Sequence, residues 1–348
     1  MALLRAKAPL RISFAGGGTD VSPYPEERGG AVLNCTIDKY AYASLDVRAD
    51  GSRRTRAHSL DYNFSLDYGP HTEFIYDGRL DLVTAALRVL RPNGRQKGST
   101  DSLELFLHSD APPGTGLGGS SSMCVALVGA FQLYLREWWS HYEIAELAYR
   151  IERRELGVQG GRQDQYASTF GGFNFIEFGR DRVTVHPLRV PPAVLNELAF
   201  RLVLCYTGTS HFSNDIIERQ TKGYTTGRSE TVEALDRTKQ LALEMKDALL
   251  HGHVDEMGEL LHRGWELKKQ FAEGITNPQI DRFYEKARRA GALGGKLVGA
   301  GGGGYLLLFC DPAHRADVLR AVRESGGSVT DFGLEHSGLQ SWAANREF

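Results

Sequence analysis

A glycine- and serine-rich stretch, PPGTGLGGSSS, occupies residues 112–122 and leads directly into an apolar segment. Glycine lets a backbone turn with positive φ and approach a bound group closely, and the unpaired N–H groups at a helix N-terminus attract anions. The stretch therefore predicts a helix start that binds an anion. A tight turn before an ordinary capped helix is the structural alternative, although three consecutive serines exceed what one cap requires.

Two common nucleotide-binding motifs do not account for this stretch. Gly114, Gly116 and Gly119 match the spacing of the dinucleotide fingerprint, which requires a strand after the helix that it opens. The residues after this helix instead have the pattern of a second helix. A Walker A loop requires Gly-Lys-Ser/Thr, and residues 112–122 contain no lysine. A serine hydroxyl at a phosphate-binding helix start can nevertheless bind Mg²⁺.

The elements that must position this loop are a mixture of strands and helices. Leu10, Ile12 and Phe14 alternate with polar residues, which is typical of a strand, and the loop itself follows an expected strand over 102–109. The same kind of pattern predicts helices over 81–90, 120–136 and 141–156, and further strands over 31–47, 171–178 and 183–188.

The second half begins after a proline-containing stretch at 189–199, which marks an expected domain boundary. A second glycine-rich run, KLVGAGGGGYLLLF, lies at 296–309. The order of elements predicts an α+β architecture, and we expect two domains, 1–192 and 193–348. The expected elements are a strand over 200–207, helices over about 212–220, 230–250, 254–271, 277–291 and 313–325, and a last strand.

Composition excludes several classes of protein. The 348 residues carry a formal net charge of −2, so no overall field favours nucleic acid or an acidic membrane surface. No apolar run approaches the length of a membrane span, and residues 1–13 lack the apolar core of a signal peptide. We expect a cytoplasmic enzyme with neither a nucleic-acid nor a membrane partner. Its cysteines lack metal-ligand spacing and are expected to be reduced thiols: Cys35, Cys124, Cys205 and Cys310.

Three segments resemble the ordered motifs of the GHMP kinases, the superfamily of galactokinase, homoserine kinase, mevalonate kinase and phosphomevalonate kinase. They are APLRISFAGGGTD at 8–20, PPGTGLGGSSS at 112–122 and KLVGAGGGG at 296–304. The resemblance implies the two-domain GHMP kinase fold, with an N-terminal α/β domain that supplies most of the nucleotide site and a C-terminal ferredoxin-like domain. It also implies an active site between these domains, with ATP and Mg²⁺ as cofactors.

Further segments narrow the resemblance to kinases of heptose 7-phosphate. They are AGGGTD at 15–20, GGRQDQYASTFGGFNFIEF at 160–178, CYTGTSHFSND at 205–215 and SGLQSW at 337–342. This resemblance implies transfer of a phosphoryl group from ATP to the anomeric hydroxyl of D-glycero-D-manno-heptose 7-phosphate, which gives the 1,7-bisphosphate on the way to a nucleotide-activated heptose. A fucokinase-like or other sugar-1-kinase is the alternative, and a catalytically silent sugar or nucleotide sensor is a second one.

The resemblance assigns roles to individual residues. Asp164 takes the position of the catalytic aspartate, where a carboxylate can accept the proton of a sugar hydroxyl; otherwise it would cap a short helix. Arg11 takes the position of the neighbouring basic residue, where a guanidinium can stabilise charge on the transferred group; otherwise it is an exposed strand arginine. The expected nucleotide ligands are Pro113, Gly114, Gly116, Leu117, Gly118, Gly119, Ser120, Ser121 and Ser122.

Metal and sugar ligands are assigned by the same resemblance. Glu152 takes the position of the Mg²⁺-binding glutamate of mevalonate kinase, with Ser120 or Ser121 as its hydroxyl partner. Glu152 and its charged neighbours otherwise form a solvated helix end. The expected sugar-binding residues are Gly17, Gly18, Thr19, Asp20, Gly301 and Gly302.

Three basic residues, Arg162, Lys268 and Lys269, are candidates for binding the remote sugar phosphate; each is otherwise a solvated surface charge. The arginine-rich stretch RRTR at 53–56 is better interpreted as a solvated hairpin tip. Histidines are not expected to bind a metal, because residues two apart on a helix, such as His251 and His253, point in different directions.

Overall fold

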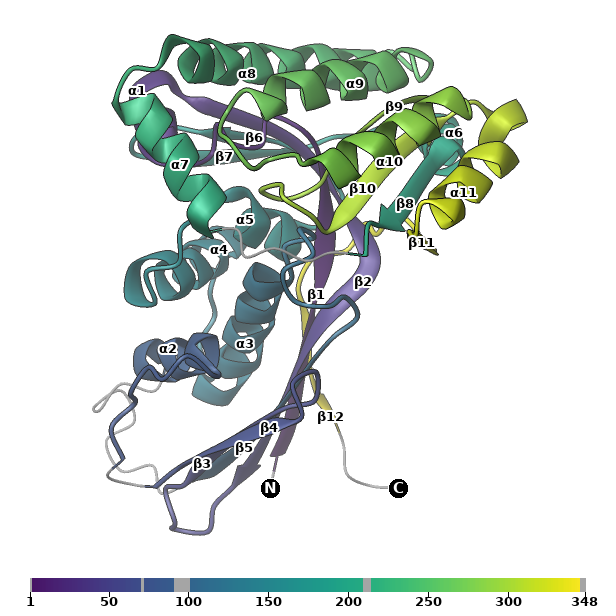
Figure 1. Cartoon of the computed structure of the whole chain (residues 1–348). Helices are drawn as coiled ribbons and strands as arrows, with labels where there is room; N and C mark the ends of the chain where they lie inside the picture. Colours follow the sequence, from purple (N-terminus) through teal and green to yellow (C-terminus); the bar gives the residue numbers. More distant parts are fainter. Residues whose placement is uncertain (1, 70–71, 91–100, 209–213, 345–348) are drawn as a thin grey trace.

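The computed structural model describes residues 2–69, 72–90, 101–208 and 214–344. In this part of the chain the strands form two sheets, one of eight strands and one of four (Figure 1). Within the same residues, no helix is both long and apolar enough to cross a bilayer. The architecture is the α+β, two-domain arrangement that the motifs predicted.

The first sheet is built around two long antiparallel strands, β1 (Ala2–Ala15) and β2 (Gly30–Arg48). Leu10, Ile12 and Phe14 are fully buried, which confirms the strand that their alternation predicted. The remaining strands are β3 (Thr55–Ser59), β4 (Phe64–Tyr68), β5 (Ser102–Ser109), β6 (Phe173–Phe178) and β7 (Val183–Pro187). The other predicted strands of the first half and the helices predicted over 81–90 and 120–136 are confirmed, but β3 and β4 were not predicted. The helix predicted over 141–156 is α-helical only to Tyr149 and continues as a π-helical turn. The helices are α1 (Tyr24–Arg28), α2 (Asp81–Leu90), α3 (Gly119–Leu135), α4 (His141–Tyr149), the π-helical turn η1 (Arg150–Glu155) and α5 (Gln163–Phe170).

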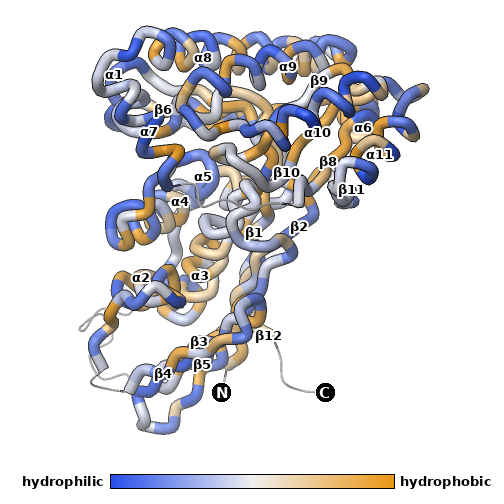
Figure 2. The backbone as a smooth tube through the Cα atoms, viewed as in Figure 1, coloured by the Kyte–Doolittle hydropathy of each residue, from blue (hydrophilic) through white to orange (hydrophobic). Residues whose placement is uncertain are grey.

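Helix α3 is central to the first half. It contacts β1, β2, α4 and α5, and its apolar residues belong to the core on one face of the sheet. A helix that is covered on most sides must be apolar around most of its circumference. Figure 2 accordingly shows hydrophobic colours along α3. This packing fixes the direction of the helix, and therefore the point at which its N-terminal loop emerges.

The second half carries the smaller sheet, with strand order β11-β8-β10-β9 and antiparallel pairing throughout. Helices α8 and α9 cover β1 and β2 from this side, so the two halves share one hydrophobic core. The strands are β8 (Leu202–Tyr206), β9 (Ala292–Leu297), β10 (Tyr305–Cys310) and β11 (Ser328–Thr330). The helices are α6 (Pro192–Arg201), α7 (Asn214–Thr225), α8 (Ser229–Leu250), α9 (Glu256–Lys269), α10 (Pro278–Arg289), the short η2 (Pro312–His314) and α11 (Arg315–Glu324).

Some boundaries differ from the sequence predictions. The strand expected over 200–207 begins at Leu202, because the two preceding residues complete α6. The helix expected from about residue 212 includes residues outside the described part of the chain, and α7 continues to Thr225. The last strand, β12 (Gln340–Ala344), pairs with β1 and thus returns to the first sheet. We propose a domain boundary at residue 192, with β12 assigned to the first domain.

Candidate active site

A cavity of about 650 Å³ lies between the two halves. The first half contributes residues of β1, the loop after β1, the 112–120 stretch and the start of α5. The second half contributes residues of α7, the end of α9 and the segment from the end of β9 to Ala300. The cavity has the position in which a GHMP kinase active site was expected.

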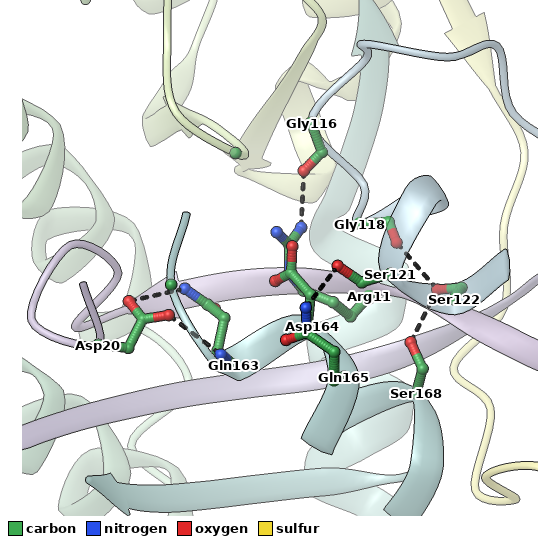
Figure 3. Close-up of polar contacts among 12 residues, drawn as sticks. Arg11, Asp20, Gly116, Gly118, Ser121, Ser122, Gln163, Asp164, Gln165 and Ser168 are labelled. Carbon is green, nitrogen blue, oxygen red and sulfur yellow. Dashed lines mark hydrogen bonds and ion pairs between the residues drawn. The ribbon is translucent and has the colours of Figure 1, made fainter. Parts of the chain in front are cut away.

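Arg11 and Asp164 form an ion pair at the wall of this cavity (Figure 3). Arg11 Nε donates a hydrogen bond to Asp164 Oδ1 at 2.6 Å, and Arg11 Nη1 donates one to the carbonyl oxygen of Gly116 at 2.6 Å. Arg11 is only 3 % exposed, so it is not a solvated strand arginine. The first N–H of α5 donates to Asp20, and Asp164 itself makes no capping hydrogen bond, so Asp164 is not a helix cap either. The pair holds a carboxylate, with 16 % of its side chain exposed, toward the cavity.

The loop before α3 lies directly against this pair. Gly114, Gly116 and Gly118 have positive φ angles of 72°, 88° and 78°, which explains why glycine is required there. A Cβ atom on Gly118 would lie 3.3 Å from Cγ of Asp164. No side chain caps α3, so the N–H groups of its first turn are available to an anion in the cavity.

Three expected nucleotide ligands do not line the cavity, because their side chains face the protein interior. Leu117 belongs to the hydrophobic core. Ser122 is fully buried, donates to the main chain of β1 at 3.1 Å and shares a hydrogen bond with Ser168 at 2.7 Å (Figure 3). Ser121 is equally buried and points away from the cavity. The expected ligands that do line the cavity are Pro113, Gly114, Gly116, Gly118, Gly119 and Ser120.

Glu152 lies behind the loop, in the π-helical turn η1, and is 1 % exposed, so it is not part of a solvated helix end. Its Oε1 accepts a hydrogen bond from Ser120 Oγ at 2.6 Å, and its Oε2 accepts one from Ser121 Oγ at 2.6 Å. Gln165 Nε2 donates a third at 2.7 Å. Turns of the π type are rare and often occur at functional sites. Sequence reasoning missed Gln165, which has no recognisable motif of its own.

The donor set around Glu152 fits Mg²⁺. This ion prefers oxygen ligands and is usually bound by one or two carboxylates together with water and substrate phosphates. Ser120 lines the cavity and holds the carboxylate of Glu152 at hydrogen-bond distance, so a hydroxyl and a carboxylate oxygen lie together beside the loop. Arg153, which also lines the cavity, has its Nη1 3.5 Å from Oε1 of Glu152 and partly balances its charge.

Asp20 lies in the loop after β1 and lines the same cavity as Arg11 and Asp164. Its carboxylate accepts hydrogen bonds from Gly18 N at 3.0 Å, from Gln163 N at 3.0 Å and from Gln163 Nε2 at 3.2 Å (Figure 3). Burial raises the pKa of Asp20, the hydrogen bond from the Gln163 backbone opposes that rise, and the nearby charge of Asp164 adds to it. Asp20 lines the cavity together with Gly17 and Gly18.

Three expected sugar-binding residues, Thr19, Gly301 and Gly302, do not line the cavity. The Thr19 hydroxyl is fully buried and donates to the main chain of the loop and of β2, so it braces the turn. Gly302 N donates to the carbonyl oxygen of Ile275, and a Cβ on Gly301 would collide with that same residue. The part of the glycine run that lines the cavity is Gly299 and Ala300.

The glycine run of the second half packs directly on the loop of the first half. A Cβ on Gly299 would lie 2.4 Å from Cα of Gly116, and a Cβ on Gly304 would lie 2.4 Å from the carbonyl oxygen of Thr115. Tyr305 N donates to that same oxygen at 3.0 Å. The two motifs, which lie far apart in the sequence, therefore form one backbone assembly.

Two buried lysines, Lys268 and Lys296, line the cavity from the second half. Burial lowers the pKa of both, to about 8 for Lys296, and the nearby charge of Arg11 adds to the effect. Lys268 was a candidate for the remote phosphate, whereas Lys296 was missed although it begins the quoted segment KLVGAGGGG. Its position at the first residue of a phosphate-associated motif was the available signal.

The other basic candidates lie elsewhere. Arg162 Nη2 donates to Glu26 at 2.8 Å, and its guanidinium lies over the ring of Tyr149. Lys269 pairs with Glu266 at 2.7 Å, and neither it nor Arg162 lines the cavity. Residues 53–56 belong to the approach to β3 and its start, where two of the arginines pair with Asp67.

These features are typical of a small-molecule kinase: two sheets around an interdomain cavity, a glycine loop at an uncapped helix start, and a carboxylate held by an arginine. The sequence matches the GHMP kinases N terminal domain over residues 81–172 and the GHMP kinases C terminal domain over residues 245–328. The chain belongs to the GHMP kinase family. It is therefore a phosphotransferase with an alcohol group as acceptor, and its kinase class implies the use of ATP.

Several known proteins are similar along nearly the whole chain. A D-glycero-alpha-D-manno-heptose 7-phosphate kinase of Campylobacter jejuni is 39 % identical over 98 % of this chain and 99 % of its own. A solved structure described as a D-glycero-D-manno-heptose 1-phosphate kinase from "Bacteriodes thetaiotaomicron" has a TM-score of 0.82 at 34 % identity, covering 98 % and 99 % of the two chains. A bifunctional fucokinase/GDP-fucose pyrophosphorylase of Arabidopsis thaliana is 27 % identical over 91 % of this chain, which spans 30 % of that protein.

Proposed function

We propose that this enzyme transfers the γ-phosphoryl group of ATP to the anomeric hydroxyl of D-glycero-D-manno-heptose 7-phosphate and forms the 1,7-bisphosphate in the cytoplasm. The full-length similarity to the Campylobacter jejuni kinase supports the heptose phosphate as acceptor. The observation that carries the proposal is the Arg11–Asp164 pair, whose carboxylate faces the cavity beside the glycine loop.

Asp164 acts as the general base. Its carboxylate accepts the proton of the anomeric hydroxyl while the hydroxyl oxygen forms a bond to the γ-phosphorus. The bond from that phosphorus to the β–γ bridging oxygen breaks, and ADP leaves with the bonding electrons. Arg11 holds both Asp164 and the carbonyl oxygen of Gly116, so the position of the base is tied to that of the loop. The N–H groups at the start of α3 stabilise the negative charge of the phosphates.

Ser120 and Glu152 are the residues that would hold Mg²⁺. When bound, the ion neutralises charge on the β- and γ-phosphates. Gln165 and Ser121 orient the carboxylate by donating to Oε2, and Ser120 presents its hydroxyl to the cavity. A carboxylate that is held in place by three donors loses little orientational freedom when it binds a cation.

Replacing Glu152 by glutamine is expected to raise the Mg²⁺ concentration needed for half-maximal rate about 10-fold or more, because the shape of the side chain stays while its charge is lost. The KM for the sugar should change little. A Mg²⁺ titration at saturating ATP measures the effect. Glu155→Gln is the matched control, since Glu155 ends the same turn and accepts instead from Tyr76 at 2.8 Å. An unchanged titration for Glu152→Gln would show that this carboxylate has only a structural role.

The phosphate of the acceptor is expected to raise kcat/KM about 10²-fold relative to the unphosphorylated heptose, because charge-assisted hydrogen bonds contribute about 1.5–3 kcal/mol each. Initial rates of ADP release with both sugars measure the ratio, and phosphorus NMR of the product identifies the oxygen that is phosphorylated. The similarity to a fucokinase makes fucose the relevant competitor. If fucose is turned over as fast as heptose 7-phosphate or faster, the proposed substrate is wrong and the enzyme is a fucokinase-like kinase.

A further inference from the structure

Two lysines of the second half are buried without a carboxylate partner. Lys268 and Lys296 are 7 % and 6 % exposed, and both line the cavity. Among the ion pairs of the described residues, neither lysine takes part in one. A buried ammonium group without a counter-charge opposes folding, so a position that retains one requires an explanation.

The contacts of both lysines leave donors for a ligand. Lys268 Nζ donates to the carbonyl oxygens of Leu297 at 2.9 Å and Gly299 at 2.5 Å, and Lys296 Nζ donates to that of Phe14 at 3.2 Å. An ammonium group has three N–H bonds. In the ammonium form, one N–H of Lys268 and two of Lys296 therefore remain for a group in the cavity. Main-chain oxygens do not cancel the positive charge of that form, and an anion in the cavity would favour it.

The lysines lie where the phosphate loop meets the base. Lys268 holds Gly299, and a Cβ on Gly299 would collide with Gly116, whose carbonyl oxygen accepts from Arg11. Lys296 lies close enough to Arg11 and Asp20 for both charges to affect its pKa, and Lys268 is affected by Lys296 and Arg11. Three cations thus surround the place where a phosphate on the loop would meet an acceptor beside Asp164.

The sequence of the loop explains why cations from another domain are needed. Residues 112–122 contain no lysine, whereas a Walker A loop supplies its own to the β- and γ-phosphates. Here the available ammonium groups come from α9 and from the end of β9, across the cavity. Charge that develops on a transferred phosphoryl group is stabilised best by groups already fixed in place.

We propose that Lys268 and Lys296 bind the phosphoryl group while it passes from ATP to the acceptor. This assignment rests on the proposed kinase reaction. The acceptor oxygen forms its bond to the γ-phosphorus, the bond to the bridging oxygen of ADP breaks, and the hydroxyl proton goes to Asp164; the lysines donate hydrogen bonds to the non-bridging oxygens and keep their own protons. The second half thereby takes a direct part in catalysis.

Lys268→Met and Lys296→Met test the assignment in the full-length enzyme. Each change is expected to lower kcat about 10²–10³-fold, the usual effect of removing one fixed donor from a transition state. The loss should be equal for heptose 7-phosphate and for the unphosphorylated heptose, with little change in sugar KM. The thermal midpoint should stay level or rise, because an uncompensated buried charge is removed. Lys269→Met, on the same helix but paired with Glu266, is the control and should leave kcat unchanged.

An unchanged kcat would overturn the proposal, as would a loss confined to the phosphorylated sugar, which would assign the lysines to the remote phosphate. A lower thermal midpoint of unfolding with an unchanged kcat would show that the two lysines have only a structural role. A second measurement covers variants that fail to fold. The native protein is reductively methylated with and without ADP, Mg²⁺ and aluminium fluoride, a mimic of the phosphoryl group in transfer, and each lysine is quantified by mass spectrometry.

Protection of Lys268 and Lys296, with Lys269 unaffected, supports the proposal, and no protection of either lysine overturns it. This measurement requires no sugar. An enzyme that does not turn over heptose 7-phosphate but still shows protection would therefore contradict the proposed substrate and not the role of the lysines.

Discussion

Asp164→Asn is expected to lower kcat about 10²–10⁴-fold while the protein still folds and binds ATP, because an amide of the same shape cannot accept the proton of the acceptor hydroxyl. The KM for ATP should change little, since Asp164 is linked to the loop through Arg11 and not by a hydrogen bond of its own. Steady-state rates with saturating sugar and ATP, together with nucleotide binding by calorimetry, measure the effect.

Asp67→Asn is the matched control for the loss of an arginine partner. Asp67 pairs with Arg54 at 2.6 Å, the same distance as in the Arg11–Asp164 pair, but on the β3–β4 hairpin and outside the cavity. Its replacement should leave kcat unchanged. If Asp164→Asn turns over within a few-fold of the parent enzyme, Asp164 is not the general base, and its role is only to position Arg11.

Gly299→Ala is expected to lower kcat/KM about 10²-fold, because displacement of catalytic groups by about 1 Å has effects of that size. The added methyl group would lie 2.4 Å from Cα of Gly116, so the two glycine motifs would have to separate. This separation would move the loop carbonyl that Arg11 holds. The free energy of unfolding should fall as well, by about 1–3 kcal/mol for the overpacking, in addition to the strain of a positive φ.

Gly227→Ala separates these two contributions. Gly227 has a φ of 69°, similar to the 78° of Gly299, but a Cβ there would meet nothing within 4 Å. It should therefore show only the backbone strain, about 1–2 kcal/mol, and full activity. Thermal unfolding and initial rates of both variants provide the comparison. If the two variants have the same activity and the same stability, the contact between the two glycine motifs does not position the catalytic groups.

Local pattern predicted the elements well in this chain. Helix α10 is an example, because Asn277 accepts from two N–H groups of its first turn and Pro278 begins it, as its sequence indicated. Helix α3 is another, because it lies within one residue of the 120–136 range that its apolar pattern predicted. These features depend on residues a few positions apart, whose interactions are formed within one element.

Contacts between residues that are far apart in the sequence could not be predicted from local sequence pattern. Ser120 and Ser122 are equivalent in the sequence, yet one faces the cavity and the other is buried against Ser168. The direction of each hydroxyl depends on what packs against α3, and β1 and α5 supply those contacts. Similarly, Lys268 and Lys269 are adjacent, but only Lys268 reaches the glycine run.

The sequence by itself determined the order of the elements, the three glycine motifs and the residue types needed for phosphoryl transfer. It also indicated where most positive φ angles occur, because glycine adopts them without steric cost, although Arg53, Asn63 and Arg136 adopt them too. The resemblance to the GHMP kinases predicted that Arg11 lies near Asp164 and that Ser120 or Ser121 accompanies Glu152. Only the tertiary structure decided how these pairs are formed, with Arg11 also bound to Gly116 and both serines bound to Glu152, and that Lys268 and Lys296 line the cavity from the second half. Such pairs are tens to hundreds of residues apart, and their distances depend on how two sheets pack around one shared core.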